Sequence, residues 1–160
     1  MPSRKPLVLV DGLVRQLPPG DTLDAASSEV DVISLTNAGA AAAPIGSPVY
    51  ISAANNFALA RANAGATARP IGLVKDASIA ASAAGFIQTD GVLEATTAEW
   101  DVITGQTGGL TAGAIYFLSA ATAGRLTTTA PVASGDYCVR VGTAISTTGL
   151  EISIHPEILL

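Results

Sequence analysis

The sequence predicts an all-β fold: a compact β-sandwich or β-barrel with an N-terminal β-hairpin arm and one short helix. The first observation is a repeat, because GSPVYISA at residues 46–53 returns as GAIYFLSA at residues 113–120. The second is a succession of short apolar or alternating segments, separated by turns rich in Gly, Pro, Asn and Asp. Together these patterns indicate duplicated β-hairpin units.

Each copy of the repeat predicts the same series of elements: a turn Gly, a strand with a Tyr, a polar turn, a second strand, a loop and a third strand. The separation between the two phrases is the same as that between Leu59 and Leu126, and it is slightly longer between Gly72 and Gly142. The second copy is therefore expected to carry about three extra residues in its loop, where β-proteins accept insertions most easily.

The chain divides into an N-terminal arm and spacer, residues 1–24, and a β-rich domain with the duplicated unit, residues 25–160. In the arm, Asp11-Gly12 stands between two apolar segments and predicts a tight hairpin, because both residue types tolerate positive φ. Pro18-Pro19 then ends the hairpin and predicts a semi-rigid extended spacer.

Outside the repeat, the pattern predicts a strand over residues 30–35, a second hairpin, and a closing strand over residues 149–154. The second hairpin would pair residues 85–89 with residues 91–94 around Asp90-Gly91, another dipeptide that favours tight turns.

One short helix is expected. Thr96 and Glu99 form a capping-box pattern, Trp100 supplies an apolar side chain, and Gly105 is the expected C-terminal stop. We interpret Glu99 and Asp101 together as negative charge at the helix N-terminus.

The composition favours assembly with other proteins. Hydrophobic residues make up 49% of the 160 residues and charged residues only 13%, about half the usual charged fraction. Such a surface is easy to bury, because few charges must be desolvated. We therefore expect an oligomer or a component of a larger assembly, with a plain monomer as the alternative.

The net charge of −5 and the scattered basic residues argue against nucleic acid as a partner. No membrane span is expected, because Pro and Asn interrupt the long uncharged run over residues 32–60, and the N-terminus does not read as a signal peptide. The single cysteine excludes an internal disulfide and indicates a reducing compartment. We interpret this residue, Cys138, as buried apolar filler in a strand over residues 137–141.

The sequence offers no residue set for catalysis, cofactor binding or metal binding. The only histidine, His155, lies near the C-terminus, and the carboxylates are spread singly. The Gly-rich residues 105–109 lack the Lys of a phosphate-binding loop. Tyr50 and Tyr116 lie in corresponding strands of the repeat, where packing explains them better than a sugar-stacking platform. We expect no enzyme, no cofactor and no metal.

Two groups of segments carry a family resemblance. The C-terminal third to half of the chain resembles a module common in structural proteins of tailed bacteriophages, and the N-terminus is similar to openings found on phage head or tail fibres. The C-terminal segments are EWDVITG (99–105), GGLTAGAIYFLS (108–119), and residues 124–131 and 141–152; the N-terminal ones are KPLVLVDG (5–12) and LPPGDTL (17–23). The chain thus resembles the capsid decoration (cement) proteins and head-fibre-like modules of tailed phages.

This resemblance implies a homotrimer on the outer surface of a phage capsid, made in the bacterial host cytoplasm. Such a trimer would bind the major capsid protein and bridge neighbouring capsomers. A body of this size with one arm fits a decoration protein better than a fibre, which is expected to carry a stalk or a large tip domain. The first alternative is a head- or tail-fibre component that binds a host surface receptor. A more distant one is a glycan-cleaving enzyme with paired carboxylates.

We expect the arm to contact the capsid or a neighbouring subunit. Its candidate contact residues are two basic side chains and four leucines: Arg4, Lys5, Leu7, Leu9, Leu13 and Leu17. For the first five residues, a disordered tail is the alternative.

Overall fold

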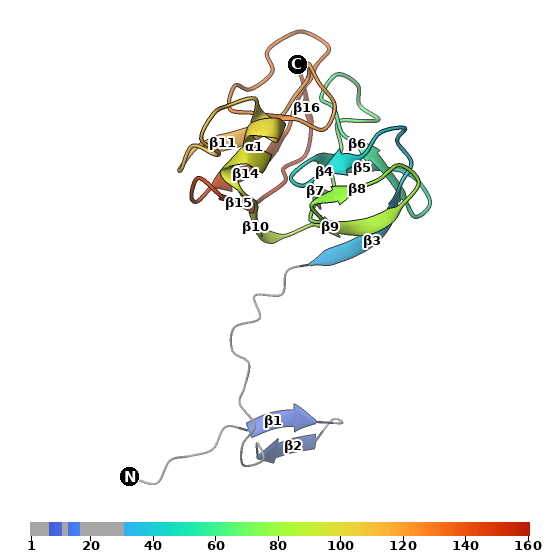
Figure 1. The fold of residues 1–160 in the computed structure, drawn as a ribbon, viewed down its shortest axis with the longest axis vertical. Helices are drawn as coiled ribbons and strands as arrows, with labels where there is room; N and C mark the ends of the chain where they lie inside the picture. The colour runs from blue at the N-terminus through green and yellow to red at the C-terminus, as the bar shows by residue number, and fades with distance from the viewer. Residues whose placement is uncertain (1–6, 11–12, 17–30) are drawn as a thin grey trace.

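The computed structural model describes residues 7–10, 13–16 and 31–160, and the side chains described are those of residues 31–160 (Figure 1). These residues form short strands and one helix, which confirms the predicted all-β class. At the N-terminus, β1 (Leu7–Val10) pairs antiparallel with β2 (Leu13–Gln16). Val10 lies opposite Leu13, so β1 and β2 form the N-terminal hairpin that the sequence predicts, while the predicted turn residues Asp11 and Gly12 lie outside the described residues.

Five strands close into a barrel, which we call the barrel unit. They are β3 (Val32–Asn37), β5 (Pro48–Ala53), β6 (Asn56–Leu59), β7 (Gly72–Val74) and β9 (Ala84–Gln88). Neighbouring strands are antiparallel except β3 and β6, whose parallel pairing closes the barrel. A short pair, β4 (Ala43–Pro44) and β8 (Ser78–Ile79), adds Ala43 and Ile79 to the barrel core.

A second set of five strands forms an open antiparallel sheet, which we call the open unit. Its strands are β10 (Gly91–Glu94), β11 (Ile115–Leu118), β12 (Leu126–Thr127), β14 (Arg140–Ala144) and β15 (Gly149–Ile152). Their spatial order is β10-β15-β14-β11-β12, with β10 and β12 at the two edges. In Figure 1 the open unit and its helix lie beside the barrel unit.

The two units have the same connectivity, so the duplication is larger than the repeat seen in the sequence. β3, β9, β7, β5 and β6 are neighbours in the barrel in the same order as β10, β15, β14, β11 and β12 in the sheet. Val49 lies opposite Gly72, and Tyr116 lies opposite Gly142. The repeat in the sequence therefore relates equivalent paired positions of the two units.

The two tyrosines lie in corresponding strands, as predicted, but at different positions within them. The repeat aligns Tyr50 with Phe117 and Val49 with Tyr116. Val49 and Tyr116 are fully buried, whereas Tyr50 and Phe117 are half-buried on the opposite faces of the same strands. The Tyr116 hydroxyl donates a hydrogen bond of 2.7 Å to Oε1 of Gln106. Tyr116 is thus a satisfied core residue.

The predicted hairpin between residues 85–89 and 91–94 is wrong. Both segments are strands, but β9 pairs with β3 and β7 in the barrel, and β10 pairs with β15 in the sheet. Gly91 has a φ of +76° and donates its N–H to Oδ1 of Asp90 at 2.8 Å. The Asp-Gly turn therefore links the two units. A turn signal fixes where the chain bends, whereas tertiary packing selects the strands that pair.

The predicted continuous strand over residues 137–141 is also wrong. β13 (Tyr137–Cys138) pairs with the C-terminal β16 (Ile158–Leu159), and β14 begins only at Arg140. The register between β11 and β14 shifts between Tyr116, which lies opposite Gly142, and Phe117, which lies opposite Arg140. This shift marks a β-bulge. Cys138 is half-buried rather than buried, opposite Ile158.

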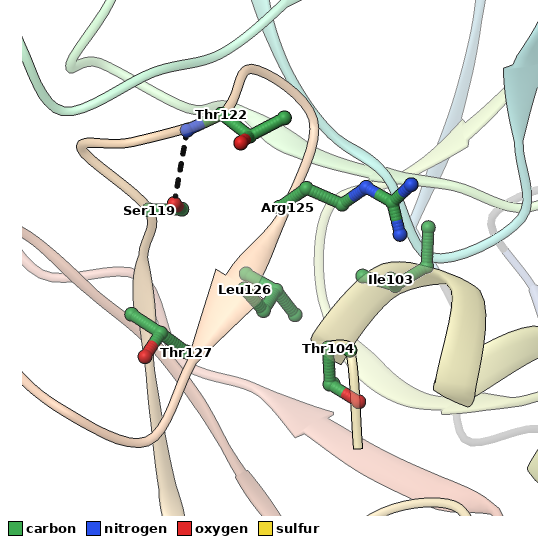
Figure 2. A pocket seen from close by; sticks show the side chains of 8 residues that line it. Ile103, Thr104, Ser119, Thr122, Arg125, Leu126 and Thr127 are labelled. Carbon is green, nitrogen blue, oxygen red and sulfur yellow. Dashed lines mark hydrogen bonds between the residues drawn. The ribbon is translucent and has the colours of Figure 1, made fainter. Parts of the chain in front are cut away.

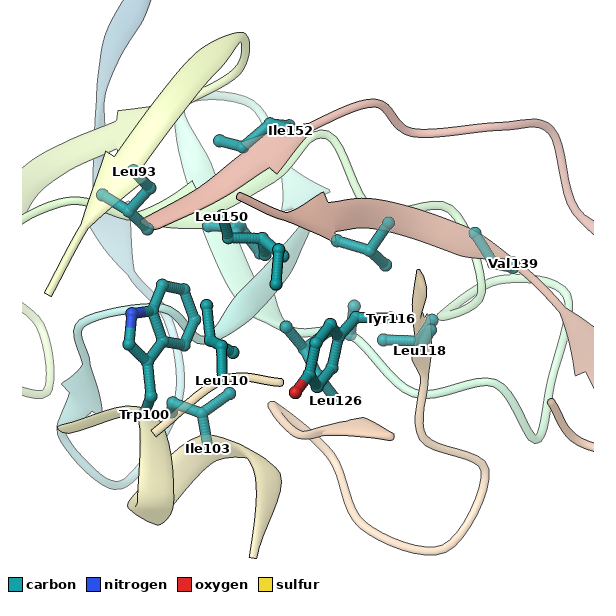
Figure 3. Close-up of a cluster of buried hydrophobic side chains, with 14 of the residues drawn as sticks. Leu93, Trp100, Ile103, Leu110, Tyr116, Leu118, Leu126, Val139, Leu150 and Ile152 are labelled. Atoms are coloured by element: carbon teal, nitrogen blue, oxygen red, sulfur yellow. The ribbon is translucent and has the colours of Figure 1, made fainter. Parts of the chain in front are cut away.

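Two hydrophobic clusters form the core. One fills the barrel and consists of Leu35, Ala43, Val49, Phe57, Val74, Ile79 and Ile87. The other joins the two units, because it contains Leu73 of the barrel wall together with Tyr116 and Leu150 of the open sheet. Figure 3 shows Tyr116 and Leu150 within this cluster. Backbone bonds reinforce this junction: Ala62 N donates to Ser119 O at 3.0 Å. The inner face of the open sheet is thus buried against the barrel unit.

The helix α1 (Thr97–Thr104) covers the rest of that inner face and has the predicted ends. Thr96 and Glu99 form the capping box, and Gly105 has a left-handed φ of 69°. Trp100 is fully buried, and its Nε1 donates to the carbonyl of Thr148 at 2.6 Å. Figure 3 shows Trp100 and Ile103 reaching from α1 toward the sheet. The indole also packs so closely on Gly46 that no side chain fits there.

Gly142→Ala is expected to destabilise the protein by roughly 3 kcal/mol, the upper end of the cost of overpacking. A Cβ at this position would overlap the carbonyl oxygen of Glu151 on β15, and Gly72 meets Gln88 in the same way. Gly113→Ala is the control, because its surroundings are open and only its φ of +80° opposes a side chain, at a cost of roughly 1 kcal/mol. Urea unfolding measures both; equal losses would contradict the close-approach explanation.

The capping box predicts a pH dependence. The backbone N–H of Thr96, and then its hydroxyl, hold the pKa of the Glu99 carboxyl below its ordinary value. Its stabilisation is therefore complete above the unfolded pKa near 4.5 and is lost as the pH falls through the lower folded pKa. Glu99→Gln should cost about 0.3–1 kcal/mol at pH 7, because the group is exposed, and progressively less toward pH 3.

Urea unfolding of both proteins between pH 7 and pH 3 measures this difference. In a Thr96→Ala background the same substitution should have a smaller effect at pH 7. A difference that stays constant with pH would rule out the charged capping box as its source.

Candidate interaction surfaces

The arm residues singled out in the sequence are only partly within the described structure. Leu7 and Leu9 lie in β1 and Leu13 in β2, whereas Arg4, Lys5 and Leu17 lie outside the described residues. Residues directly opposite each other in an antiparallel pair share a face. Leu9 lies opposite Val14, and Leu13 lies opposite Val10. The register therefore places Leu7 and Leu9 on one face of the hairpin and Leu13 on the other.

The open unit presents a sheet face that sequence reasoning did not single out. One row crosses four strands, because Val92 pairs with Glu151, Glu151 with Thr143, and Thr143 with Ile115. The side chains of Val92 and Ile115 are 36% and 40% exposed. The sequence shows the alternation of apolar and polar residues within each strand, but only the strand order reveals that these residues share a row.

A second row extends this face. Glu94 lies opposite Gly149, and a Cβ on Gly149 would meet both the Glu94 carboxylate and the Ile145 side chain. Ile145 is 54% exposed. Phe117, half-buried, continues the face on β11. The members of the outer sheet face are thus Val92, Glu94, Ile115, Phe117, Thr143, Ile145 and Glu151.

The charge of the outer sheet face comes from Glu94 and Glu151, both exposed, and from Arg140 at its margin. Nη2 of Arg140 donates to Oγ1 of Thr143 at 2.8 Å, while its buried Nε has no partner among the described residues. Two carboxylates against one guanidinium leave a negative excess beside the exposed aliphatic side chains. The face is therefore apolar and mildly acidic.

A groove lies at the edge of the same sheet, between the end of α1 and the β11–β12 loop (Figure 2). Its volume is about 470 Å³. Its lining consists of Ile103, Thr104, Gly105, Ser119, Thr122, Arg125, Leu126 and Thr127. Figure 2 shows Arg125 extending toward Ile103 across the groove. Arg125 is the one ionisable side chain of the lining, so the groove holds no pair of groups for general acid–base catalysis.

The Gly-rich loop after α1 is held by the helix itself. Asp101 accepts hydrogen bonds from the N–H groups of Gly108 at 3.2 Å and Gly109 at 2.7 Å. The interpretation of Asp101 as helix N-terminal charge is therefore wrong, although Glu99 does have that role. Because a carboxylate already occupies these N–H groups, they are not free to bind a phosphate.

The other side chains that could take part in catalysis or metal binding do not form a site together. His155 is exposed, and Cys138 is a free thiol. Within the described ranges, no three His, Cys, Asp or Glu side chains come together as a metal site. The same residues include no helix long and apolar enough to cross a membrane.

Known proteins give no further guide to these surfaces. No protein-family model matches the chain, and no curated protein matches it.

Asp101→Ala is expected to lower the free energy of unfolding by about 1.5–3 kcal/mol, the usual range for a hydrogen bond to a charged group. The carboxylate fixes the loop through Gly108 and Gly109, which lose their acceptor in the variant. Asp136→Ala is the matched control, because no side-chain hydrogen bond to Asp136 occurs in the described structure. Urea unfolding measures the loss. A thermal shift of the unmodified protein by phosphate would contradict the structural role of this loop.

Proposed function

We propose that this chain is a structural protein of a tailed-phage virion, which decorates the outer capsid as a homotrimer and stabilises the contacts between capsomers. One observation carries the proposal: an apolar hairpin that pairs with no other described strand accompanies a β-body with an exposed apolar sheet face. Both features are suited to contact with other proteins. The resemblance of the C-terminal segments to phage structural modules is the reason for proposing a tailed-phage virion as the assembly.

The mechanism would be mechanical. Packaged DNA pushes capsomers apart, and a trimer that lies across their boundary adds buried surface that must be lost before the shell opens. Each contact can be modest, because binding to the closed shell shifts the equilibrium toward it and because three linked sites raise the effective concentration of one another. The major capsid protein would be the partner, and the arm would supply one of the contacts.

The alternative is a fibre component that binds a host surface receptor. The groove beside α1 is the feature it would use, since hydroxyl groups and Arg125 line it. Glycan sites usually add an aromatic side chain on which a sugar ring stacks. No aromatic residue lines this groove. The decoration function therefore has the better support.

The double variant Leu7→Asp, Leu9→Asp tests the arm as the capsid contact. Burial of one Leu contributes about 1.5–3 kcal/mol, so loss of both should weaken binding to undecorated capsids at least tenfold. Co-sedimentation of the full chain with capsids measures the affinity, and cryo-electron microscopy locates the bound density. Val132→Asp is the control, because Val132 is an apolar side chain with 88% exposure in the body.

Unchanged capsid binding by the double variant would contradict the role of the arm. Binding to host cells but not to capsids would favour the receptor-binding alternative.

A further inference from the structure

We propose that the outer sheet face receives the N-terminal hairpin of a second copy of this chain. The inference rests on the proposed function in one respect, namely that copies assemble with one another. It assigns a receiving surface to one face of the hairpin and leaves the other face for the capsid.

The open sheet is covered on its inner side and uncovered on its outer side. Its inner side is buried against α1 and the barrel unit. Its outer side exposes Val92, Ile115 and Ile145 by 36%, 40% and 54%. An antiparallel sheet with a solvated outer face usually carries polar residues there. Aliphatic side chains at these positions therefore indicate a face that is covered in the assembled state.

The hairpin needs cover on both of its faces. Its register places Leu7, Leu9 and Val14 on one face, and Val8, Val10 and Leu13 on the other. A two-stranded hairpin is at best marginally stable alone in water, and strands without alternation are typical of burial on both sides. One partner covers one face, so two partners are required.

Charge selects which face meets the sheet. Residues 1–16 contain three basic residues and one acidic residue, whereas residues 31–160 contain five basic and nine acidic ones. Arg15 lies opposite Val8, on the face that also carries Val10 and Leu13. That face complements the aliphatic residues and the two carboxylates of the outer sheet face, Glu94 and Glu151.

The described body begins beside this surface, at Asp31. The N–H and Oγ1 of Thr89 donate to the carbonyl of Asp31 at 2.8 and 3.1 Å, so the chain enters β3 next to the start of β10, the edge strand of the sheet. Fourteen residues, 17–30, separate the hairpin from this point. Fully extended, they span at most about 46–50 Å.

The spacer composition favours a neighbour over the same chain. Pro18-Pro19 predicts a semi-rigid extended spacer, which favours docking of the hairpin on another copy. An exchange of identical arms then joins copies at repeated contacts, the low-cost route by which protomers swap an element.

The length of the hairpin agrees with the width of the outer sheet face. Four residues per strand give the hairpin a length of about 13 Å, and neighbouring strands lie about 4.8 Å apart. The row from Val92 to Ile115 crosses four strands, so it spans about 14 Å. The hairpin is therefore long enough to cross the row from Val92 to Ile115.

A disulfide-trapping experiment tests the exchange in solution, without capsids. In a Cys138→Ser background, one full-length chain carries Val10→Cys and a second carries Ile145→Cys. Co-expressed and oxidised, they should form a covalent heterodimer on a non-reducing gel. Val132→Cys replaces Ile145→Cys in the control, which should give at least tenfold less product.

Two outcomes would overturn the proposal. The first is absence of the heterodimer at concentrations where the chain is oligomeric. The second is a crosslink formed within single chains, seen when a chain with both cysteines is co-expressed with an excess of the unsubstituted one.

Charge reversal supplies an independent readout. Arg15→Glu should raise the concentration at which the oligomer dissociates at least tenfold in analytical ultracentrifugation, and Glu151→Arg in the same chain should restore it. Lys75→Glu is the matched control on the exposed barrel surface. An equal effect of the control, or absence of rescue, would overturn the proposed contact.

These results are separable from those on capsid binding. Exchange without capsid binding would refute the proposed function alone, and capsid binding by a chain that shows no exchange would refute this inference alone.

Discussion

The structure depends on how the open sheet buries its inner face. In the barrel unit, β3 pairs with β6, so the sheet closes and its inner face is buried inside the barrel. In the open unit, the equivalent edges β10 and β12 do not pair, so the inner face needs another cover. Trp100 of α1 and Leu73 of the barrel wall provide it. This burial fixes the two units against each other, and it leaves the outer face of the sheet with no cover from the same body.

The two units therefore have different physical roles despite their common connectivity. A closed barrel has no free edge and buries a core within itself, so its strands need no further pairing partner. An open sheet with one exposed face is suited to contact. The chain enters β3 beside β10, through the bonds from Thr89 to Asp31. The start of β3 and the edge strand β10 of the open sheet thus lie close together, although they are far apart in sequence.

The elements predicted best were those with a local cause. The capping box of Thr96 and Glu99 and the N-terminal hairpin are determined by a few adjacent residues, and the repeat was found from two similar phrases. The errors share a different origin. The Asp90-Gly91 turn joins two sheets, and Asp101 holds a loop, because long-range packing selected these partners. The outer sheet face could not be predicted, since its rows combine residues from strands whose order no local pattern specifies.

A negative body with a low density of charge has a consequence for assembly. Copies with a net charge of the same sign repel one another weakly at long range, and this repulsion is screened beyond about 8–10 Å in physiological salt. Short-range complementarity then decides which surfaces meet. In the proposed exchange, residues 1–16, which contain three basic residues and one acidic residue, would bring charge of the opposite sign to a neighbour while the acidic bodies stay apart. If copies assemble as proposed, the N-terminal segment would provide the association while the acidic bodies keep the protein soluble.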